Sequence, residues 1–313
     1  MSQSKSHPST VGQANGSLAG HLACASAYVI FGLNIVVCKD ISDYGAISPT
    51  LMFTFRALGA ALLFWLLSLF MPHEKVARKD LPGIIGASVL GLFIPQMTFL
   101  VAITMTTSID TSILSSFSPI MTMIIAAVFL HEPITVMKVG GVAMSFAGVL
   151  LLIFNSFHAA GAVDVTQPLG VVLILCNCLS FACYLGIFRP LISRYSVVTF
   201  MKWSFLVSLL LSLPFSMHDL INCQWSAIPT KVVLDILFVV FFATFIAYYL
   251  IPFGQKRIRP TLVSMYSYAQ PLLASIISIC IGQDKVTWQK VVAATFVFTG
   301  VALVNKSRSA QKA

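Results

Sequence analysis

Residues 81–104 read LPGIIGASVLGLFIPQMTFLVAIT, a run without a single Asp, Glu, Lys or Arg. As an α-helix with a rise of about 1.5 Å per residue, this run is long enough to cross the roughly 30 Å hydrocarbon core of a bilayer. An uncharged stretch of this length is typical of a transmembrane helix. The stretch therefore predicts that the chain is embedded in a membrane.

Similar apolar runs lie on both sides of this one. The predicted spans cover residues 17–38, 48–70, 81–104, 108–130, 136–156, 168–188, 197–216, 232–253, 260–282 and 287–304. Composition agrees, because 58% of the 313 residues are hydrophobic and 9% are charged, whereas soluble domains carry about 25% charged residues. We predict an all-α membrane protein of ten transmembrane helices. A polar tail at 1–16 is expected to be disordered, and a short basic tail follows at 305–313.

Basic residues concentrate on one side of the predicted membrane. If the N-terminus lies in the cytoplasm, thirteen Lys and Arg residues fall on the inner side and four on the outer side. This asymmetry follows the positive-inside rule and predicts that both termini, including both tails, are cytoplasmic in the cell (inner) membrane. The net charge of +9 therefore reflects topology and contact with lipid phosphates, and we expect no nucleic-acid partner.

The two halves of the sequence match each other. One gapless shift of 152 residues pairs Ser115 with Ser267, Pro119 with Pro271, Glu132 with Asp284, Lys138 with Lys290, and Gly148 with Gly300. Each half holds five predicted spans, and an odd number places the second half upside down relative to the first. We therefore predict two inverted five-helix repeats, 17–156 and 168–304, an organisation common among secondary transporters.

Several short patterns carry a resemblance to a known family. They are Phe31-Gly32-Leu33-Asn34 followed by Lys39, Ser48-Pro49 followed by Arg56, Thr106-Thr107-Ser108 through Ser118-Pro119 to Leu130-His131-Glu132, and Thr244 to Tyr248 followed by Gln270-Pro271. In these patterns the chain resembles the EamA-type branch of the drug/metabolite transporter superfamily, over about residues 17–304. It departs in having Phe31 and Phe181 in place of the usual Trp, and Gln283-Asp284 for the second Gly-Glu. The resemblance implies a ten-helix bundle that moves small metabolites, often outward, across the cytoplasmic membrane.

Two basic residues lie inside predicted spans. Arg56 is about eight residues into its span, close to the membrane midplane, where an unpaired charge is costly. It either contacts a substrate carboxylate or phosphate, or it satisfies backbone carbonyls and fixes helix packing. Lys202 lies about five residues into the seventh span, where it either snorkels to the headgroups or faces a pore.

Other candidate substrate-binding residues are polar or aromatic side chains within spans. They are Asn34, Gln96, Ser115, Tyr184, Trp203, Tyr248, Ser267 and Gln270. Small polar residues on the fourth span fall on one helical face, which either lines a cavity or permits close helix packing. Pro119 and Pro271 interrupt the hydrogen-bond ladder in mid-span and are predicted hinges.

The leading hypothesis is a secondary-active or facilitative transporter that exports small polar metabolites such as amino acids by alternating access. A P-loop is absent from the sequence, and the isolated titratable residues do not form a catalytic or metal-ligating pattern. We therefore expect a non-enzymatic protein without cofactor or metal, whose partners are a small-molecule substrate and membrane lipids. The oligomeric state is left open between monomer and homodimer.

Two questions stay open at this stage. Proton coupling would depend on Asp110 or Asp235, and the alternative is that both are solvated acids at the outer interface. The alternative functions are a non-transporting membrane scaffold or assembly protein, and a nucleotide-sugar or lipid-carrier type transporter of the same superfamily. A membrane enzyme is the third class, and it would need clustered titratable groups near one interface.

Overall fold

The computed structural model describes residues 10–130, 135–158, 166–258, 263 and 266–310, and within these ranges every regular element is a helix. Seven helical segments in this part of the chain are long and apolar enough to cross a membrane. Two shorter apolar helices, Val139–Leu151 and Ala269–Cys280, accompany them. The chain is therefore a multi-pass membrane protein.

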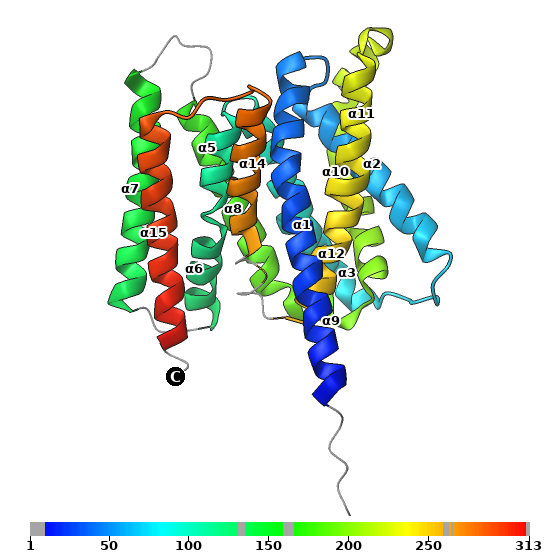
Figure 1. Cartoon of the computed structure of the whole chain (residues 1–313). Coiled ribbons are helices and arrows are strands. Elements are labelled where there is room, and N and C mark those ends of the chain that lie inside the picture. Colours follow the sequence, from blue (N-terminus) through cyan, green and yellow to red (C-terminus); the bar gives the residue numbers. More distant parts are fainter. Residues whose placement is uncertain (1–9, 131–134, 159–165, 259–262, 264–265, 311–313) are drawn as a thin grey trace, which may run out of the picture.

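The helices follow one another with short connections (Figure 1). They are α1 (Thr10–Tyr44), α2 (Pro49–Ser68), α3 (Leu81–Ser88), α4 (Ile94–Ile103), α5 (Ser108–Ser115), α6 (Ser118–Leu130), α7 (Val136–His158), α8 (Pro168–Ile187), α9 (Arg189–Arg194), α10 (Val197–Asn222), α11 (Thr230–Phe238), α12 (Ala247–Gln255), α14 (Ala269–Cys280) and α15 (Trp288–Ala310). Single 3-10 turns form η1 (Arg78–Asp80), η3 (Trp225–Ala227) and η5 (Tyr266–Tyr268). Two wider π-helical segments, η2 (Val89–Phe93) and η4 (Val239–Ile246), join α3 to α4 and α11 to α12.

Two helices extend beyond the predicted apolar spans. Helix α1 begins at Thr10, so the last part of the tail predicted to be disordered is helical, and α15 continues to Ala310 through most of the predicted basic tail. Once an apolar span has nucleated a helix, each further residue adds a hydrogen bond at little cost, which extends the helix beyond the apolar part. Residues 1–9 and 311–313 lie outside the described residues.

The predicted span 108–130 is divided into two helices. A turn at Ser116 and Phe117 separates α5 from α6, immediately before Pro119. Proline lacks the amide hydrogen that would continue the ladder, and its ring clashes with the preceding turn. The interruption predicted at Pro119 is therefore present. It takes the form of a break between two helices at Ser116 and Phe117.

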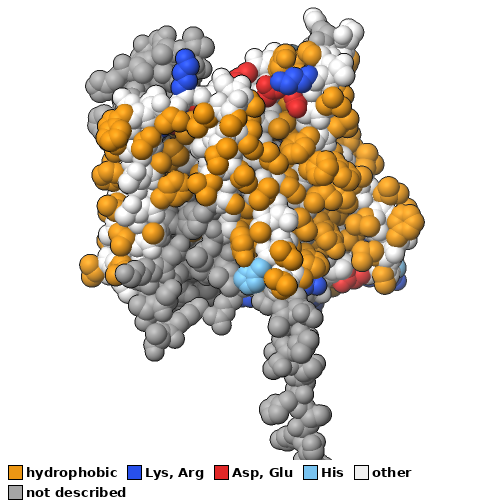
Figure 2. All heavy atoms as spheres, viewed as in Figure 1, with side chains coloured by type: hydrophobic (Ala, Val, Ile, Leu, Met, Phe, Trp, Pro, Cys, Tyr) orange, Lys and Arg blue, Asp and Glu red, His pale blue; other side chains and the backbone are white. Residues whose placement is uncertain are grey.

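The bundle has two distinguishable ends. The described chain ends, Thr10 and Ala310, lie at the same end, together with α9 and the start of α3, and we name this the terminal end (Figure 1). The opposite end, where α1 stops and α5, α11 and α15 begin, is the far end. On the face drawn in Figure 2, hydrophobic side chains cover the middle of the bundle and charged side chains gather toward its two ends. This distribution suits a bilayer around the middle and water at both ends.

Helix pairs hold the bundle together. Helix α7 packs along α15, α2 packs along α10, α1 packs against α12 and α14, and α8 packs against α4 and α6. The α7–α15 pair is very close, because a Cβ atom at Gly148 would lie 2.8 Å from the carbonyl oxygen of Ala293, and one at Gly300 would strike the carbonyl oxygen of Gly141. Small residues permit this approach between membrane helices. Helices α1, α2, α4, α8, α12 and α14 surround a central space.

Candidate functional site: a central cavity

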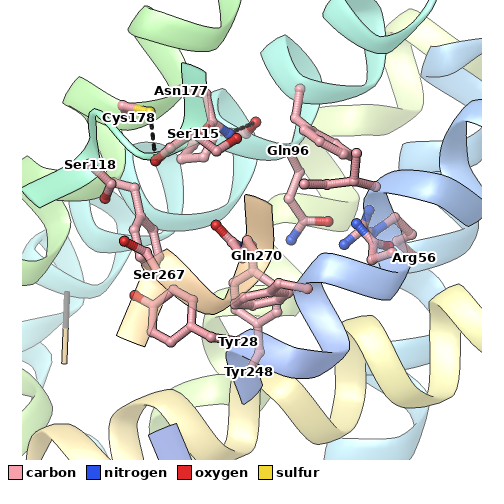
Figure 3. A pocket seen from close by; sticks show the side chains of 16 residues that line it. Tyr28, Arg56, Gln96, Ser115, Ser118, Asn177, Cys178, Tyr248, Ser267 and Gln270 are labelled. Atoms are coloured by element: carbon pink, nitrogen blue, oxygen red, sulfur yellow. Dashed lines mark hydrogen bonds between the residues drawn. The ribbon is translucent and has the colours of Figure 1, made fainter. Parts of the chain in front are cut away.

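A cavity of about 680 Å³, part of which is open to solvent, lies between the helices. Its wall is formed by Tyr28, Phe31, Asn34 and Ile35 of α1, Arg56 of α2, Pro95, Gln96 and Phe99 of α4, Ser115 and Ser118 at the α5–α6 break, Asn177, Cys178 and Phe181 of α8, Tyr248 of α12, Ser267 of η5 and Gln270 of α14. Figure 3 shows that the labelled side chains come from many segments and surround one space. Both predicted halves therefore contribute to the cavity.

Arg56 is the charged residue of this wall. The residue is only 2% exposed. Its Nε donates a hydrogen bond to the Thr244 hydroxyl at 3.0 Å, and its Nη1 lies 3.9 Å from the Cys38 sulfur. Among the residues that the structure describes, no carboxylate lies within 4 Å of the guanidinium group. Its contacts are thus a hydroxyl and a thiol, and the positive charge lacks an anion at the place where one would stabilise it.

Arg56 is held in place by the π-helical segment η4. The Thr244 hydroxyl, which accepts the hydrogen bond from Arg56, itself donates to the carbonyl oxygen of Val239 at 2.8 Å. A π turn widens the helix and frees carbonyl groups from the regular ladder, which explains how Thr244 can reach this acceptor. The orientation of Arg56 therefore depends on the irregular geometry of η4.

Several polar groups of the wall have incomplete hydrogen bonding. Gln96 is 3% exposed. Neither of its amide atoms makes a hydrogen bond of ordinary geometry with a described residue, although the Tyr248 hydroxyl is close enough to interact. The Tyr28 hydroxyl is also buried and unbonded within the described part. A buried polar group left unsatisfied costs about 1–3 kcal/mol, so this wall is suited to water or to a polar ligand.

Aromatic rings form the other part of the wall. The Phe31 ring meets Tyr28 edge-on at 5.8 Å and Tyr248 edge-on at 5.6 Å, measured between ring centres. Tyr248 in turn contacts Phe205 of α10 at 5.6 Å. Such a packed set of rings gives a firm apolar surface beside polar tips. The cavity therefore combines a cation, amides and hydroxyls with an apolar wall.

The helix break at Pro119 is covered by α8. In an unbroken helix the carbonyl of Ser115 would accept from residue 119, and Pro119 has no amide hydrogen to donate. The Cys178 sulfur lies 3.9 Å from this carbonyl oxygen and 3.8 Å from that of Leu114 (Figure 3). Asn177 donates to the carbonyl oxygen of Pro95 at 2.6 Å. Neighbouring side chains thus satisfy irregular backbone at membrane depth.

Seven of the predicted substrate-binding residues lie on the cavity wall. They are Asn34, Arg56, Gln96, Ser115, Tyr248, Ser267 and Gln270. The predicted hinges lie close by, since Pro119 is the second residue of α6 and Pro271 the third of α14. The structure thus brings these residues together around one space.

Three predicted residues lie outside the cavity. The ammonium group of Lys202 is 4.9 Å from the centre of the Trp65 ring, and Trp203 meets the same ring edge-on at 5.6 Å. Lys202 is 7% exposed, so it neither faces the pore nor extends to the headgroups. A cation over an indole ring is stabilised by the ring quadrupole, which gives this lysine a partner between α2 and α10. Tyr184 packs against Phe181 and against Gly91, beside the cavity wall.

Some wall residues were not among the predicted ones. Their spacing in the sequence could have identified Tyr28, Phe31 and Ile35, because these residues share one face of α1 with Asn34. Cys178 gave no such signal, since its position depends on the break in another helix.

Asp110 differs from the sequence interpretation. It is not a solvated acid at the interface: it is 4% exposed, and its side chain lies in a cluster with Lys290 and Asp284 at the far end. The ammonium group of Lys290 compensates part of the buried negative charge, which lowers the free-energy cost of burying it. Asp235 is partly exposed, in keeping with an interfacial position.

Comparison with known proteins places the chain in a family. A model of the EamA-like transporter family matches residues 18–154 and again residues 168–306. The uncharacterized transporter YetK of Bacillus subtilis (strain 168) is 24% identical over 83% of this chain and 79% of its own length. The uncharacterized transporter YyaM of the same organism is 24% identical over 87% of this chain and 89% of its own length.

More distant similarities extend this picture. A WAT1-related protein of Arabidopsis thaliana is 21% identical over 90% of this chain and 83% of its own. One crystal structure, 16% identical in sequence, has a TM-score of 0.63 and covers 96% of this chain and 99% of its own, which shows a common fold. Because the family model matches most of the sequence in two consecutive copies, the chain belongs to the EamA-like transporter family.

Proposed function

We propose that this protein is a secondary-active or facilitative transporter that exports small polar metabolites carrying a carboxylate, such as amino acids, by alternating access. The observation that carries the proposal is Arg56, a buried cation without a carboxylate partner in the described chain, which faces the central cavity. A substrate carboxylate would supply the missing anion, and guanidinium groups bind carboxylates through two parallel hydrogen bonds. Gln96, Asn34 and Gln270 would bind the remaining polar groups of the substrate.

Many transporters that work by alternating access are built from two structurally related halves, and the packing supports two inverted five-helix repeats with ten spans in all. The pairs α2–α10 and α7–α15 each join corresponding helices of the two halves. The contact of α1 with α14 corresponds to that of α8 with α6, and the contact of α1 with α12 corresponds to that of α8 with α4. A two-fold axis that relates the halves produces this pattern, and with five spans in each half the axis would lie in the membrane plane.

Local irregularities repeat at a spacing close to the 152 residues of the sequence repeat. The π-helical segments begin at Val89 and Val239, 150 residues apart, in what would be the third and eighth spans. Both lie against the cavity-forming helices, and one of them holds the partner of Arg56. Irregular turns rarely recur by chance at corresponding positions, because π segments are uncommon and concentrate at functional sites.

Two acidic caps also correspond. At the far end, Asp219 of α10 accepts hydrogen bonds from Ser48 and Thr50 at the start of α2, each at 2.5 Å. At the terminal end, Glu74 accepts from the backbone amide of Ser196 at the start of α10, at 2.9 Å and 3.2 Å. Each half therefore places an acid at the N-terminus of the partner half's second helix, where the helix dipole favours a negative charge.

The substrate class is argued from the charge of the cavity. Arg56 is the one charged side chain among the lining residues, and Lys202 lies outside the cavity against Trp65. A single cation suits one carboxylate, whereas a nucleotide diphosphate or lipid diphosphate would leave further negative charge without a partner. The aromatic wall beside Arg56 would accommodate an apolar side chain of the substrate.

Export is proposed together with an orientation. With the terminal end in the cytoplasm, the basic residues between spans fall mostly on the inner side. The cytoplasmic cell membrane is then the location, and both chain ends lie inside.

Counterflow into liposomes tests the function. The purified full chain is reconstituted with each of the twenty amino acids on the inside, and exchange with the same labelled amino acid outside is measured. We expect exchange for a subset of them that is at least tenfold above protein-free liposomes, and its loss in Arg56→Ala with Lys202→Met as the matched control. Absence of exchange for every amino acid, with a well-folded protein in the membrane, would favour the scaffold alternative, and unchanged exchange in Arg56→Ala would remove Arg56 from the substrate path.

A further inference from the structure

A buried cluster of charges lies at the far end, away from the cavity wall. The Lys290 ammonium group lies 2.7 Å from Asp284 Oδ1, 3.0 Å from the Thr107 hydroxyl and 3.9 Å from Asp110 Oδ1. The side chains of Lys290, Asp110 and Asp284 are 7%, 6% and 3% exposed. The cluster joins the start of α5 to the start of α15, which belong to opposite predicted halves.

The cluster holds two carboxylates and one ammonium group. Asp284 is well paired, since its Oδ1 accepts from Lys290 and its Oδ2 accepts from the Ile109 backbone amide at 3.1 Å. Asp110 is not, because its Oδ2 is hydrogen-bonded to the Thr166 hydroxyl at 2.5 Å while its Oδ1 makes no hydrogen bond within the described chain. If both acids were ionised, one negative charge would stay buried and uncompensated, which is costly.

The internal repeat marks Asp110 as the additional acid. The shift of 152 residues pairs Asp284 and Lys290 with Glu132 and Lys138, one acid and one base in each half. The same shift pairs Asp110 with Leu262. One acid and one base at these positions are therefore common to both halves of the sequence, whereas Asp110 has no acidic counterpart and is not needed to balance Lys290.

A proton suits this site better than a metal ion. The Lys290 ammonium already occupies the space that faces both acids, and it would repel a second cation, whereas a proton on Asp110 needs no room. Helices α14, α8, α1, α15 and α4 pack against α5. The charged groups that act on Asp110 are Lys290 and Asp284, while Lys39 and Asp40 on α1 are paired with Asp43 and Lys231.

We propose that Asp110 is a proton-binding site whose occupancy is coupled to closure of the far end. With the far end closed, Asp110 holds a proton taken from the adjoining water, and the cluster is neutral. Separation of α5 from α15 hydrates the carboxyl group, which releases this proton to the same water as the cluster opens. Acidic conditions on this side therefore favour the closed far end. The coupling to opening rests on the proposed transport cycle, but the protonation itself does not.

Infrared spectroscopy tests the protonation directly. The purified full chain in lipid, without substrate, is expected to show the stretching band of a protonated, buried carboxylic acid at neutral pH. This band should disappear in Asp110→Asn. It should also disappear in Asp284→Asn, where Asp110 becomes the single partner of Lys290 and ionises. The matched control is Asp43→Asn, an exposed acid at the same end, which should keep the band.

Thiol accessibility tests the coupling. In a background with the native cysteines replaced, Ile113→Cys places a thiol on α5 just below the cluster, at a residue that is 2% exposed. At each pH, its modification rate by an aqueous reagent is divided by that of an exposed thiol in the same background, Asp43→Cys, because the thiolate is the reacting form and its own titration raises every rate. This normalised rate should rise several-fold between about pH 5 and about pH 9, the range over which buried carboxylic acids ionise. The same rise should be absent when Asp110→Asn is added.

Three results would overturn the proposal. The first is the absence of a protonated carboxyl band, and the second is a band that persists in Asp110→Asn. The third is a normalised modification rate that does not rise with pH, or that rises as much when Asp110→Asn is present. Because the infrared band is measured without substrate, its presence together with failed amino-acid exchange would refute the proposed function and leave the proton site standing.

Discussion

In the proposed function, substrate binding in the cavity depends mainly on Arg56. Replacement by Lys keeps the charge but removes the forked geometry and the Nε bond to Thr244, and the two side chains are not equivalent at such a site. A hydrogen bond to a charged group contributes about 1.5–3 kcal/mol. We therefore expect Arg56→Lys to bind its amino-acid substrate about 10-fold to 100-fold more weakly, as measured by titration of the purified protein. Unchanged affinity would show that the guanidinium group does not contact the substrate.

A comparison of Lys202 with a residue of the cavity wall tests which side chains belong to the substrate site. Its ammonium group lies over Trp65 and not in the cavity, so Lys202→Met should leave substrate affinity within about twofold, while losing a cation–π contact of roughly 0.5–2 kcal/mol. Gln270→Ala, on the cavity wall, should weaken binding instead. Both affinities come from the same titration, and a reversed order would contradict the assignment of the wall.

At the scale of single residues, sequence reasoning identified a polar or charged group in a predicted apolar span but not its partner. Arg56 and Gln96 could be identified from the sequence as candidate site residues, because polar and charged side chains are costly inside a membrane. The burial of Asp110 could not be predicted from the sequence, because it depends on Lys290, which lies 180 residues further along the chain. Lys202 was misplaced for the same reason, since Trp65 belongs to another helix.

Helices α7 and α15 test the role of close packing at the scale of elements. A Cβ atom at Gly300 would strike the Ser145 hydroxyl and the backbone of Gly141, whereas one at Gly140 meets nothing within 4 Å. Gly300→Ala should therefore destabilise the bundle by about 1–3 kcal/mol through overpacking, and Gly140→Ala should not. Thermal unfolding of both variants in detergent measures the difference, and equal midpoints would refute the close contact.

The cap on α10 makes stability depend on pH at the terminal end. Burial alone would raise the pKa of Glu74, but hydrogen bonds from Ser196 and Thr199 outweigh it and hold the pKa below its ordinary value of 4.5. Because the folded pKa is the lower one, the stabilisation is present above the ordinary value and is lost as pH falls through the folded pKa.

Replacement of this acid tests the cap. Glu74→Gln should lower stability at neutral pH by about 1 kcal/mol, as loss of a helix cap does, and the difference should vanish in strong acid. Unfolding midpoints measured across pH give the comparison, with Asp43→Asn as the control at an exposed pair. The charged cap would be ruled out if the unfolding midpoints of Glu74→Gln and of the unaltered chain differed by the same amount at every pH.

The helical elements were largely predictable, and their irregularities were not. Long apolar runs predicted most spans to within a few residues, because the thickness of a bilayer fixes helix length. The π-helical segments η2 and η4 left no mark in the sequence, since hydrophobic residues surround both. Pro119 did signal an interruption, and the structure shows that it takes the form of a break between α5 and α6.

The whole molecule is a bundle whose walls come from both halves of the chain. The sequence repeat and the corresponding helix contacts support the proposed arrangement of two inverted units around one cavity. Charged groups lie at each end of the bundle, with Glu74 and the Asp80–Arg194 pair at the terminal end and Asp110, Asp284 and Lys290 at the far end. In the proposed cycle the two ends of the bundle open in turn.

Cavity access from each side of the membrane is the most direct measurement of alternating access. Ser115 lies on the cavity wall, so Ser115→Cys in a background without native cysteines places one thiol there. Membrane-impermeant reagents are applied to right-side-out and inside-out vesicles in turn. Alternating access predicts modification from both sides, at rates that a transported amino acid lowers. Modification from one side only, or from neither, would contradict it.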